Sequence, residues 1–264
     1  MSSAPPASDS VLEVDDLVRR FGGLTAVSVE HLEVRRHTIT ALIGPNGAGK
    51  TTLFNVLTGF DRPDGGRWIF DGTDVSGWPA HRIARQGMVR TFQLTKALAG
   101  MTVLDNMLLG APRQRGEQML LAPLRFRWRA EERAVHERAL ALLDDFGLLA
   151  KQHDFAATLS GGQRKLLEMA RALMADPQLV MLDEPMAGVN PALVQSLLDH
   201  VRKVRDAGRT IVFVEHDMDV VLSISDWVVC LAEGKVIAEG PPSEVVSNQD
   251  VIEAYLGHRR ARPA

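Results

Sequence analysis

The fold is decided by the stretch Gly44-Pro45-Asn46-Gly47-Ala48-Gly49-Lys50-Thr51-Thr52, which follows the apolar run Thr40–Ile43 and precedes a helix-like run, Leu53–Leu57. This order predicts a strand, a glycine-rich loop and a helix N-terminus. The glycines let successive backbone N–H groups point at phosphate oxygens, and the helix adds the positive end of its dipole. We expect Lys50 to reach the β- and γ-phosphates of a nucleotide and the Thr51 hydroxyl to ligate Mg²⁺. All nine residues are predicted to bind nucleotide.

The composition predicts a globular α/β protein without a nucleic-acid partner. A chain of 264 residues can bury a sizeable core, and a net charge of −3 with a pI near 6.2 provides no basic surface for nucleic acid. The single cysteine, Cys230, lies in the apolar run Trp227–Leu231 and is expected to be buried. One cysteine allows no intrachain disulfide, which suits a reducing, cytosolic location.

The two ends of the chain have a different character from its middle. Residues 1–10 have neither a basic nor an apolar signal region, and we expect them to form a short disordered lead. Residues 258–264 form a small basic tail, interpreted as a solvated terminus. No stretch approaches 18 consecutive apolar residues, so a membrane-spanning helix is not expected.

The elements between these ends predict three structural parts. Strand patterns at Val11–Val14, Val27–Val34 and Trp68–Phe70 indicate an antiparallel β subdomain around the glycine-rich loop. Helical periodicity indicates an inserted helical subdomain at about 94–175. After it, strands alternate with helices, which is typical of a mostly parallel sheet, and a hairpin and a closing helix near Ser243–Tyr255 follow. We therefore expect one α/β domain over residues 11–257.

Two further segments could act on a bound nucleotide. Leu179–Glu184 is an apolar strand that ends in two acids, and ligands bind at that edge of α/β sheets. Asp183 suits the Mg²⁺ shell, and Glu184 could deprotonate a water molecule. Leu159–Gln163 precedes a helical run with Ser160 at the N-cap, and so offers a second site for an anion. Because one nucleotide has a single triphosphate, this second site suggests the ATP of a partner subunit.

The segments Gly44–Thr52, Leu159–Gln163 and Leu179–Glu184, in this order, resemble the nucleotide-binding domain of ATP-binding cassette (ABC) transporters. The resemblance covers nearly the whole chain. It implies a P-loop NTPase core, ATP and Mg²⁺ as cofactors, and ATP hydrolysis.

The resemblance also implies roles for three isolated residues. Phe21 matches the aromatic residue that stacks on adenine, Gln93 matches the glutamine loop, and His216 matches the switch histidine. Taken alone, they could be a core aromatic, a surface amide and a strand-end histidine. Their occurrence in the ordered set favours the functional roles.

Within the family, four segments look like the ATPases of branched-chain and hydrophobic amino-acid uptake systems: Arg90–Gln93, Glu184–Pro191, Glu215–Met218 and Val251–Gly257. The loop with Gly188 and Asn190 departs from the family, which often has Ser-Ala-Leu-Asp at 187–190. The Asn190 amide can form a hydrogen bond across a dimer interface but carries no charge.

By this resemblance, two ATPase subunits face each other head to tail. Each ATP lies between the glycine-rich loop of one chain and Ser160, Gly161, Gly162 and Gln163 of the other. The implied catalytic residues are Glu184, His216 and Gln93, and the implied Mg²⁺ ligands are Thr51, Gln93 and Asp183. Transmembrane permease subunits, and indirectly a substrate-binding protein, are the implied partners, at the cytoplasmic face of the membrane.

Alternatives remain open from the sequence. The transported solute could be urea or an amide, because the cassette does not touch it. One alternative class is a non-transport ATPase that acts on DNA or ribosomes, and the single cassette and the negative net charge argue against it. Another is a nucleotide sensor without turnover, and the presence of Glu184 and His216 argues against that class. For the permease contact, the sequence suggests a groove with Leu98, Met101, Phe126 and Trp128, although packing within the helical insert is an equal interpretation.

Overall fold

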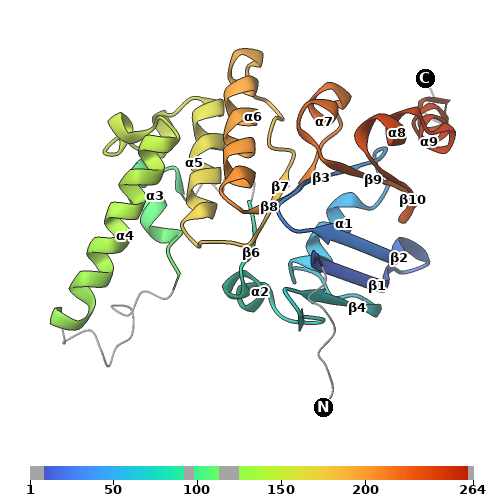
Figure 1. The fold of residues 1–264 in the computed structure, drawn as a ribbon, viewed down its shortest axis with the longest axis horizontal. Coiled ribbons are helices and arrows are strands. Elements are labelled where there is room, and N and C mark those ends of the chain that lie inside the picture. The colour runs from blue at the N-terminus through green and yellow to red at the C-terminus, as the bar shows by residue number, and fades with distance from the viewer. Residues whose placement is uncertain (1–8, 92–97, 113–124, 261–264) are drawn as a thin grey trace. The chain divides into compact units, whose positions relative to one another are not determined.

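The computed structural model describes residues 9–91, 98–112 and 125–260, and its helices and strands are drawn in Figure 1. The chain divides into two compact units. The first unit holds residues 1–90, 178–185 and 201–264, and the second holds residues 91–177 and 186–200. Within the residues that the structure describes, every helix is too short or too polar to span a bilayer.

An antiparallel sheet of four strands forms one layer of the first unit, in the order β2-β1-β4-β5. Its strands are β1 (Ser10–Phe21), β2 (Leu24–Arg35), β4 (Gly65–Phe70) and β5 (Thr73–Asp74). Buried and more exposed residues alternate along much of β1 and β2, as expected for a sheet with one face on the core. The antiparallel layer predicted on both sides of the glycine-rich loop is confirmed.

The second sheet of this unit has six strands in the order β10-β9-β3-β8-β7-β6. They are β3 (Ile39–Ile43), β6 (Met88–Arg90), β7 (Leu179–Asp183), β8 (Thr210–Val214), β9 (Trp227–Ala232) and β10 (Lys235–Gly240). All pairs are parallel except the β9–β10 hairpin. Every residue of β3 and β8 is buried, which explains their continuous apolar sequences. Because β3, β7 and β8 are parallel neighbours, their carboxyl ends lie at one edge of the sheet.

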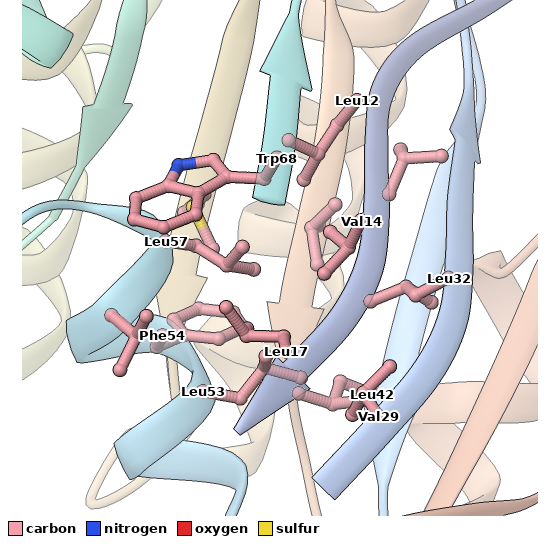
Figure 2. Close-up of a cluster of buried hydrophobic side chains, with 14 of the residues drawn as sticks. Leu12, Val14, Leu17, Val29, Leu32, Leu42, Leu53, Phe54, Leu57 and Trp68 are labelled. Carbon is pink, nitrogen blue, oxygen red and sulfur yellow. The ribbon is translucent and has the colours of Figure 1, made fainter. Parts of the chain in front are cut away.

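The core of the first unit lies between the antiparallel sheet and helix α1 (Lys50–Leu57). Figure 2 shows Leu53, Phe54 and Leu57 of α1 turned toward side chains of β1, with Trp68 of β4 beside them. Leu57 follows Leu53 by four residues and Phe54 by three, so it shares a helix face with both. This packing fixes the helix that begins at Lys50.

The remaining helices of this unit are α2 (Ala80–Gln86), α7 (Met218–Ile224), α8 (Pro242–Ser247) and α9 (Gln249–Arg260). The prediction of one closing helix near Ser243–Tyr255 is wrong, because the segment forms two helices. Asn248 lies between them in an extended conformation, and its side chain accepts a hydrogen bond from the Asp250 amide at 2.8 Å. An asparagine that caps the next helix interrupts the first one.

The second unit is helical. It contains α3 (Val103–Leu109), α4 (Arg125–Asp145), η3 (Leu149–Lys151), η4 (Ala156–Thr158), α5 (Gly161–Leu173) and the part of α6 (Pro191–Asp206) up to His200. Helix α3 packs against α4 and α5. The sequence favours local packing for Val103, Leu104 and Met107, and in α3 Val103 and Met107 are fully buried whereas Leu104 is partly buried.

Candidate nucleotide-binding site

The glycine-rich loop joins the end of β3 to the start of α1. Gly44, Gly47 and Gly49 have φ values of 146°, 80° and 98°, a region that favours glycine. At Gly49 a Cβ atom would lie 2.3 Å from the carbonyl oxygen of Ala26, so no side chain fits there. Helix α1 has no side-chain cap and no acidic residue in its first turn. The positive end of its dipole is therefore left for an external anion.

Lys50 places its cation against the loop itself. Its Nζ donates hydrogen bonds to the carbonyl oxygens of Gly44 at 2.7 Å and Pro45 at 2.9 Å. Burial lowers the pKa of Lys50, and the negative charges of Glu184 and Asp183 oppose this shift. The ammonium group is thus held at the loop, beside both acids, and can neutralise phosphate oxygens there.

A pocket of about 750 Å³ opens over the loop. The predicted residues that line it are Phe21, the residues Asn46 to Thr52, and Glu184. Five residues without a predicted role also line it: Leu24, Thr25, Ala26, Glu233 and Gly234. They come from β2 and the β9–β10 turn, and their sequences carry no phosphate motif. The volume and the lining suit a nucleotide, with an aromatic ring and a phosphate loop in one cavity.

Phe21 lies at the end of β1 with 49% of its surface exposed. The guanidinium carbon of Arg19 lies 4.4 Å from its ring centroid, and Arg19 is itself paired with Asp61 at 2.9 Å. The cation covers one face of the ring. Arg19 and Phe21 are two residues apart on β1, so their side chains lie on the same face of the sheet. The alternation of side chains along a strand could therefore have predicted this contact.

The two acids follow β7. Asp183 accepts a hydrogen bond from Arg90 Nη2 at 2.6 Å, and Arg90 Nη1 donates to Asn55 at 2.6 Å. Glu184 has a φ of 46°, which is unusual for a residue with a Cβ atom, and its amide donates to Val214 of β8 at 3.1 Å. This turn directs Glu184, and not Asp183, into the lining of the pocket.

The donor set suits Mg²⁺. Thr51 offers a hydroxyl oxygen and Asp183 a carboxylate oxygen, and phosphate oxygens would complete the shell. Among the described residues, no group of three or more histidine, cysteine, aspartate or glutamate side chains could hold a metal by itself. An oxygen-rich shell shared with the nucleotide is the arrangement that Mg²⁺ prefers. Gln93, the third expected ligand, lies outside the described residues.

His216 follows the end of β8 and is largely exposed. Its Nδ1 lies 3.7 Å from Oε2 of Glu215, whose side chain is 1% exposed, and its amide donates to the same oxygen at 3.2 Å. Glu215 therefore restricts the backbone and the ring of His216. Glu215 is not among the site residues that the sequence predicts.

The second unit contains the other predicted anion site. Ser160 caps α5, its hydroxyl accepting from the Gln163 amide at 3.3 Å, and the Gln163 side chain accepts from the Ser160 amide at 3.0 Å. This capping box occupies two amides that were expected to be available to an anion. A Cβ atom at Gly162 would lie 2.5 Å from Leu193, and one at Gly161 would lie 3.7 Å from the Gly188 carbonyl oxygen.

The same unit therefore brings the loop with Gly188, predicted at the dimer interface, beside Gly161 of the segment Leu159–Gln163. Gly188 has a φ of 71°, and the carbonyl oxygen of Asn190 accepts from the amides of Leu193 and Val194 at the start of α6.

Cys230 is buried, as predicted, and burial raises the pKa of its thiol to about 11.

Comparison with known proteins agrees with this site. The family model described as ABC transporter matches residues 28–187, and the model described as branched-chain amino acid ATP-binding cassette transporter matches residues 235–261. The chain is 42% identical to the probable branched-chain amino acid transport ATP-binding protein LivG of Archaeoglobus fulgidus, over 94% of this chain and 95% of that protein. It is also 42% identical to the high-affinity branched-chain amino acid transport ATP-binding protein BraF of Pseudomonas aeruginosa, over 95% and 99%.

Solved structures agree as well. An ATP-binding cassette of an ABC transporter in its ADP conformation is 37% identical, with a TM-score of 0.83 over 94% of this chain and 99% of that one. A nucleotide-free cassette gives a TM-score of 0.82 at 36% identity, over 93% and 98%. These matches confirm the P-loop NTPase fold that the sequence predicts. The chain belongs to the ABC transporter family and is one of its ATP-hydrolysing cassettes.

Proposed function

We propose that this chain powers the import of branched-chain amino acids from the cytoplasmic face of the cell membrane. Two relatives named for branched-chain amino acid transport, each 42% identical over nearly its full length, support this substrate class. The observation that carries the ATP-driven part of the proposal is the pocket in which the glycine-rich loop, Phe21 and Glu184 meet. Permease subunits, a second ATPase subunit and a substrate-binding protein complete the proposed system.

ATP binding rests on the first unit. The loop from Gly44 to Thr52 surrounds the phosphates, with Lys50 as the cation, and the uncovered face of Phe21 receives the adenine ring. Thr51 and Asp183 would hold Mg²⁺, which would supply positive charge to the phosphate oxygens. Arg90 keeps the Asp183 carboxylate oriented for this role. We also assign Gln93 to the Mg²⁺ shell, by the resemblance.

Hydrolysis requires a base and a residue that orients the attacking water. We assign the base to Glu184, because its carboxylate lines the pocket and its amide is tied to the neighbouring strand β8. His216, restrained by the buried Glu215, braces the γ-phosphate and the water. Glu215 is buried directly after β8 and holds His216, so the position of His216 depends on the end of that strand.

The second subunit completes each site. We assign Ser160, Gly161, Gly162 and Gln163 to contact with the partner's ATP, and Gly188 and Asn190 to the interface between the chains. Gly161 packs beside Gly188, and Gly162 packs beside Leu193. This packing supports the assignment of the two segments to one rigid surface. The Ser160 oxygen accepts from the Gln163 amide, and its hydroxyl proton can still be donated to a phosphate oxygen.

The permease contact is assigned to Leu98 and Met101, which are half-buried on the second unit. The side chains of Phe126 and Trp128, expected at the same groove, lie outside the described part of the structure. Crosslinking from cysteines placed at Leu98 and Met101 to a reconstituted permease tests the contact. The absence of any crosslink would move the docking surface to another face.

Uptake of labelled leucine, isoleucine and valine tests the substrate class. The gene is deleted in the organism that makes the protein and restored as wild type or as Glu184→Gln. We expect deletion to remove high-affinity uptake, the wild type to restore it, and the variant to fail. Normal uptake of all three amino acids after deletion, with loss of urea or amide uptake instead, would contradict the proposal.

A further inference from the structure

The C-terminal helix α9 contacts the first residue of the glycine-rich loop. The Gly44 amide donates a hydrogen bond to the hydroxyl oxygen of Tyr255 at 2.8 Å, although 211 residues separate the two in the sequence. Both residues belong to the first unit. The segment Val251–Gly257 carries a family resemblance in the sequence, and it has no part in the proposed reaction.

The Gly44 amide needs this partner because it lies just beyond a strand. In the parallel ladder, Leu42 pairs with Val214 and Ile43 pairs with Cys230, and no residue of β3 follows. Gly44 is buried. A buried backbone N–H group must find an acceptor, and the Tyr255 hydroxyl supplies it.

Gly44 is held on two other sides. A Cβ atom at Gly44 would lie 2.1 Å from the carbonyl oxygen of Leu231, so its backbone presses on β9. Its own carbonyl oxygen accepts the hydrogen bond from Lys50 Nζ at 2.7 Å. One residue thus connects the Tyr255 hydroxyl to the Lys50 cation.

The helix that carries Tyr255 is itself anchored. It packs against α8 and β10. Val251, one turn before Tyr255 on the same helix face, is 4% exposed, whereas Ile252 and Leu256 face solvent. Burial raises the pKa of Tyr255 to about 12, so the hydroxyl stays neutral and adds no negative charge beside a phosphate.

We propose that Tyr255 is a positioning residue of the ATP site: its hydroxyl fixes Gly44, and through Gly44 the loop and Lys50, so that the C-terminal segment sets the affinity for nucleotide. The proposal goes beyond the import function, because it concerns ATP binding by this chain whatever solute is moved. It also assigns a physical role to residues 235–261, the segment with its own family match.

Tyr255→Phe tests the proposal, because it removes the hydroxyl and keeps the ring. Isothermal titration of the purified full chain with Mg-ADP gives Kd, and steady-state hydrolysis gives KM and kcat for ATP. Loss of one net hydrogen bond predicts Kd and KM about 3- to 10-fold higher with kcat little changed. Leu256→Ala, on the exposed face of the same helix, is the control and should leave all three constants unchanged.

A purely structural role would lower Tm while the folded protein kept its wild-type Kd and KM, and that result would overturn the proposal. A second measurement does not depend on a variant. Tyr255 is the one tyrosine of the chain, so incorporation of 3-fluorotyrosine gives a single ¹⁹F signal. We expect saturating Mg-ADP to shift this signal, because phosphate binding changes the loop that its hydroxyl holds. A signal that does not move would also overturn the proposal.

Discussion

Arg90 joins the end of β6 to the end of β7, since its Nη2 atom donates to Oδ2 of Asp183 at 2.6 Å. The arginine side chain is 7% exposed and the aspartate 21%, so water screens this pair little. The second nitrogen of the guanidinium is used at the same time, by Asn55 of α1 at 2.6 Å. The pair therefore links two strands and the helix that follows the glycine-rich loop.

Arg90→Leu should destabilise the chain by about 2–4 kcal/mol, because it leaves the Asp183 carboxylate without its cation and the Asn55 oxygen without that donor. Urea denaturation measures the change. Arg67→Leu is the matched control, since Arg67 pairs with Asp15 at 3.2 Å on the exposed surface, and its loss should be below about 1 kcal/mol. Equal effects of the two variants would show that Arg90 does not hold Asp183.

Glu168 of α5 should make stability depend on pH. It is 4% exposed, and burial raises its pKa to about 7, with Lys165 and Arg171 opposing the shift. Between pH 4.5 and 7 the folded protein keeps a proton that the unfolded chain has lost, so stability falls as pH rises and the full penalty is present above pH 7.

The effect of Glu168→Gln on the free energy of unfolding should therefore be about 3 kcal/mol more stabilising at pH 8 than at pH 5. At pH 5 the Glu168 side chain of the folded protein is protonated and neutral, like the glutamine that replaces it. Thermal melts at the two pH values measure this difference. Glu137→Gln on the exposed surface of α4 is the control for the loss of an acid, and it should change Tm little. The same Tm change at both pH values would contradict the prediction.

Lys50→Ala and Thr51→Ala should impair the site in different ways. Removal of Lys50 takes away the cation held at the Gly44 and Pro45 carbonyl oxygens, so ATP binding should weaken with or without Mg²⁺. Removal of the Thr51 hydroxyl should act through Mg²⁺, and excess Mg²⁺ should restore part of the activity. Titration of ATP at several Mg²⁺ concentrations separates the two roles. If excess Mg²⁺ leaves both variants equally impaired, the distinction fails.

The local parts of the site could be predicted from the sequence, because each depends on a few adjacent residues. Glycines with positive φ shape the loop, an apolar run ends in Asp183, and Ser160 with Gln163 caps a helix. Contacts between distant segments could not be predicted in this way. Tyr255 meets Gly44 only because α9 packs on β10, and Arg90 meets Asp183 only because β6 and β7 pair.

The availability of backbone amides at Leu159–Gln163 could also not be predicted fully from the sequence. The sequence predicts a helix N-terminus with amides available to an anion, but the capping box uses the amides of Ser160 and Gln163 within the helix. The Gln163 side chain competes with an external ligand, and its rotamer is not encoded by the glycine pattern. Ser160 is therefore expected to act through its hydroxyl proton.

Ser160→Arg should leave nucleotide binding by the monomer intact and block ATP-induced pairing, because a bulky cation fills the space for the partner's γ-phosphate. Light scattering of the chain with Glu184→Gln and ATP measures pairing. Ser160→Ala is the control for the lost cap, which costs about 1 kcal/mol of stability, and it should pair at least in part. Undiminished pairing of Ser160→Arg would argue against the head-to-tail arrangement.

The proposed general base of ATP hydrolysis is Glu184, and the Glu184→Gln variant removes this base alone. The amide keeps the shape of the side chain and loses the basic oxygen, so ATP affinity should stay near the wild-type value while kcat falls on the order of 10²–10⁴-fold. Equilibrium binding of ATP and steady-state phosphate release, measured on the same preparation, give both quantities. ATP bound with near wild-type affinity and almost no turnover is the predicted result. Turnover near the wild-type rate would contradict the account and move the base to another residue.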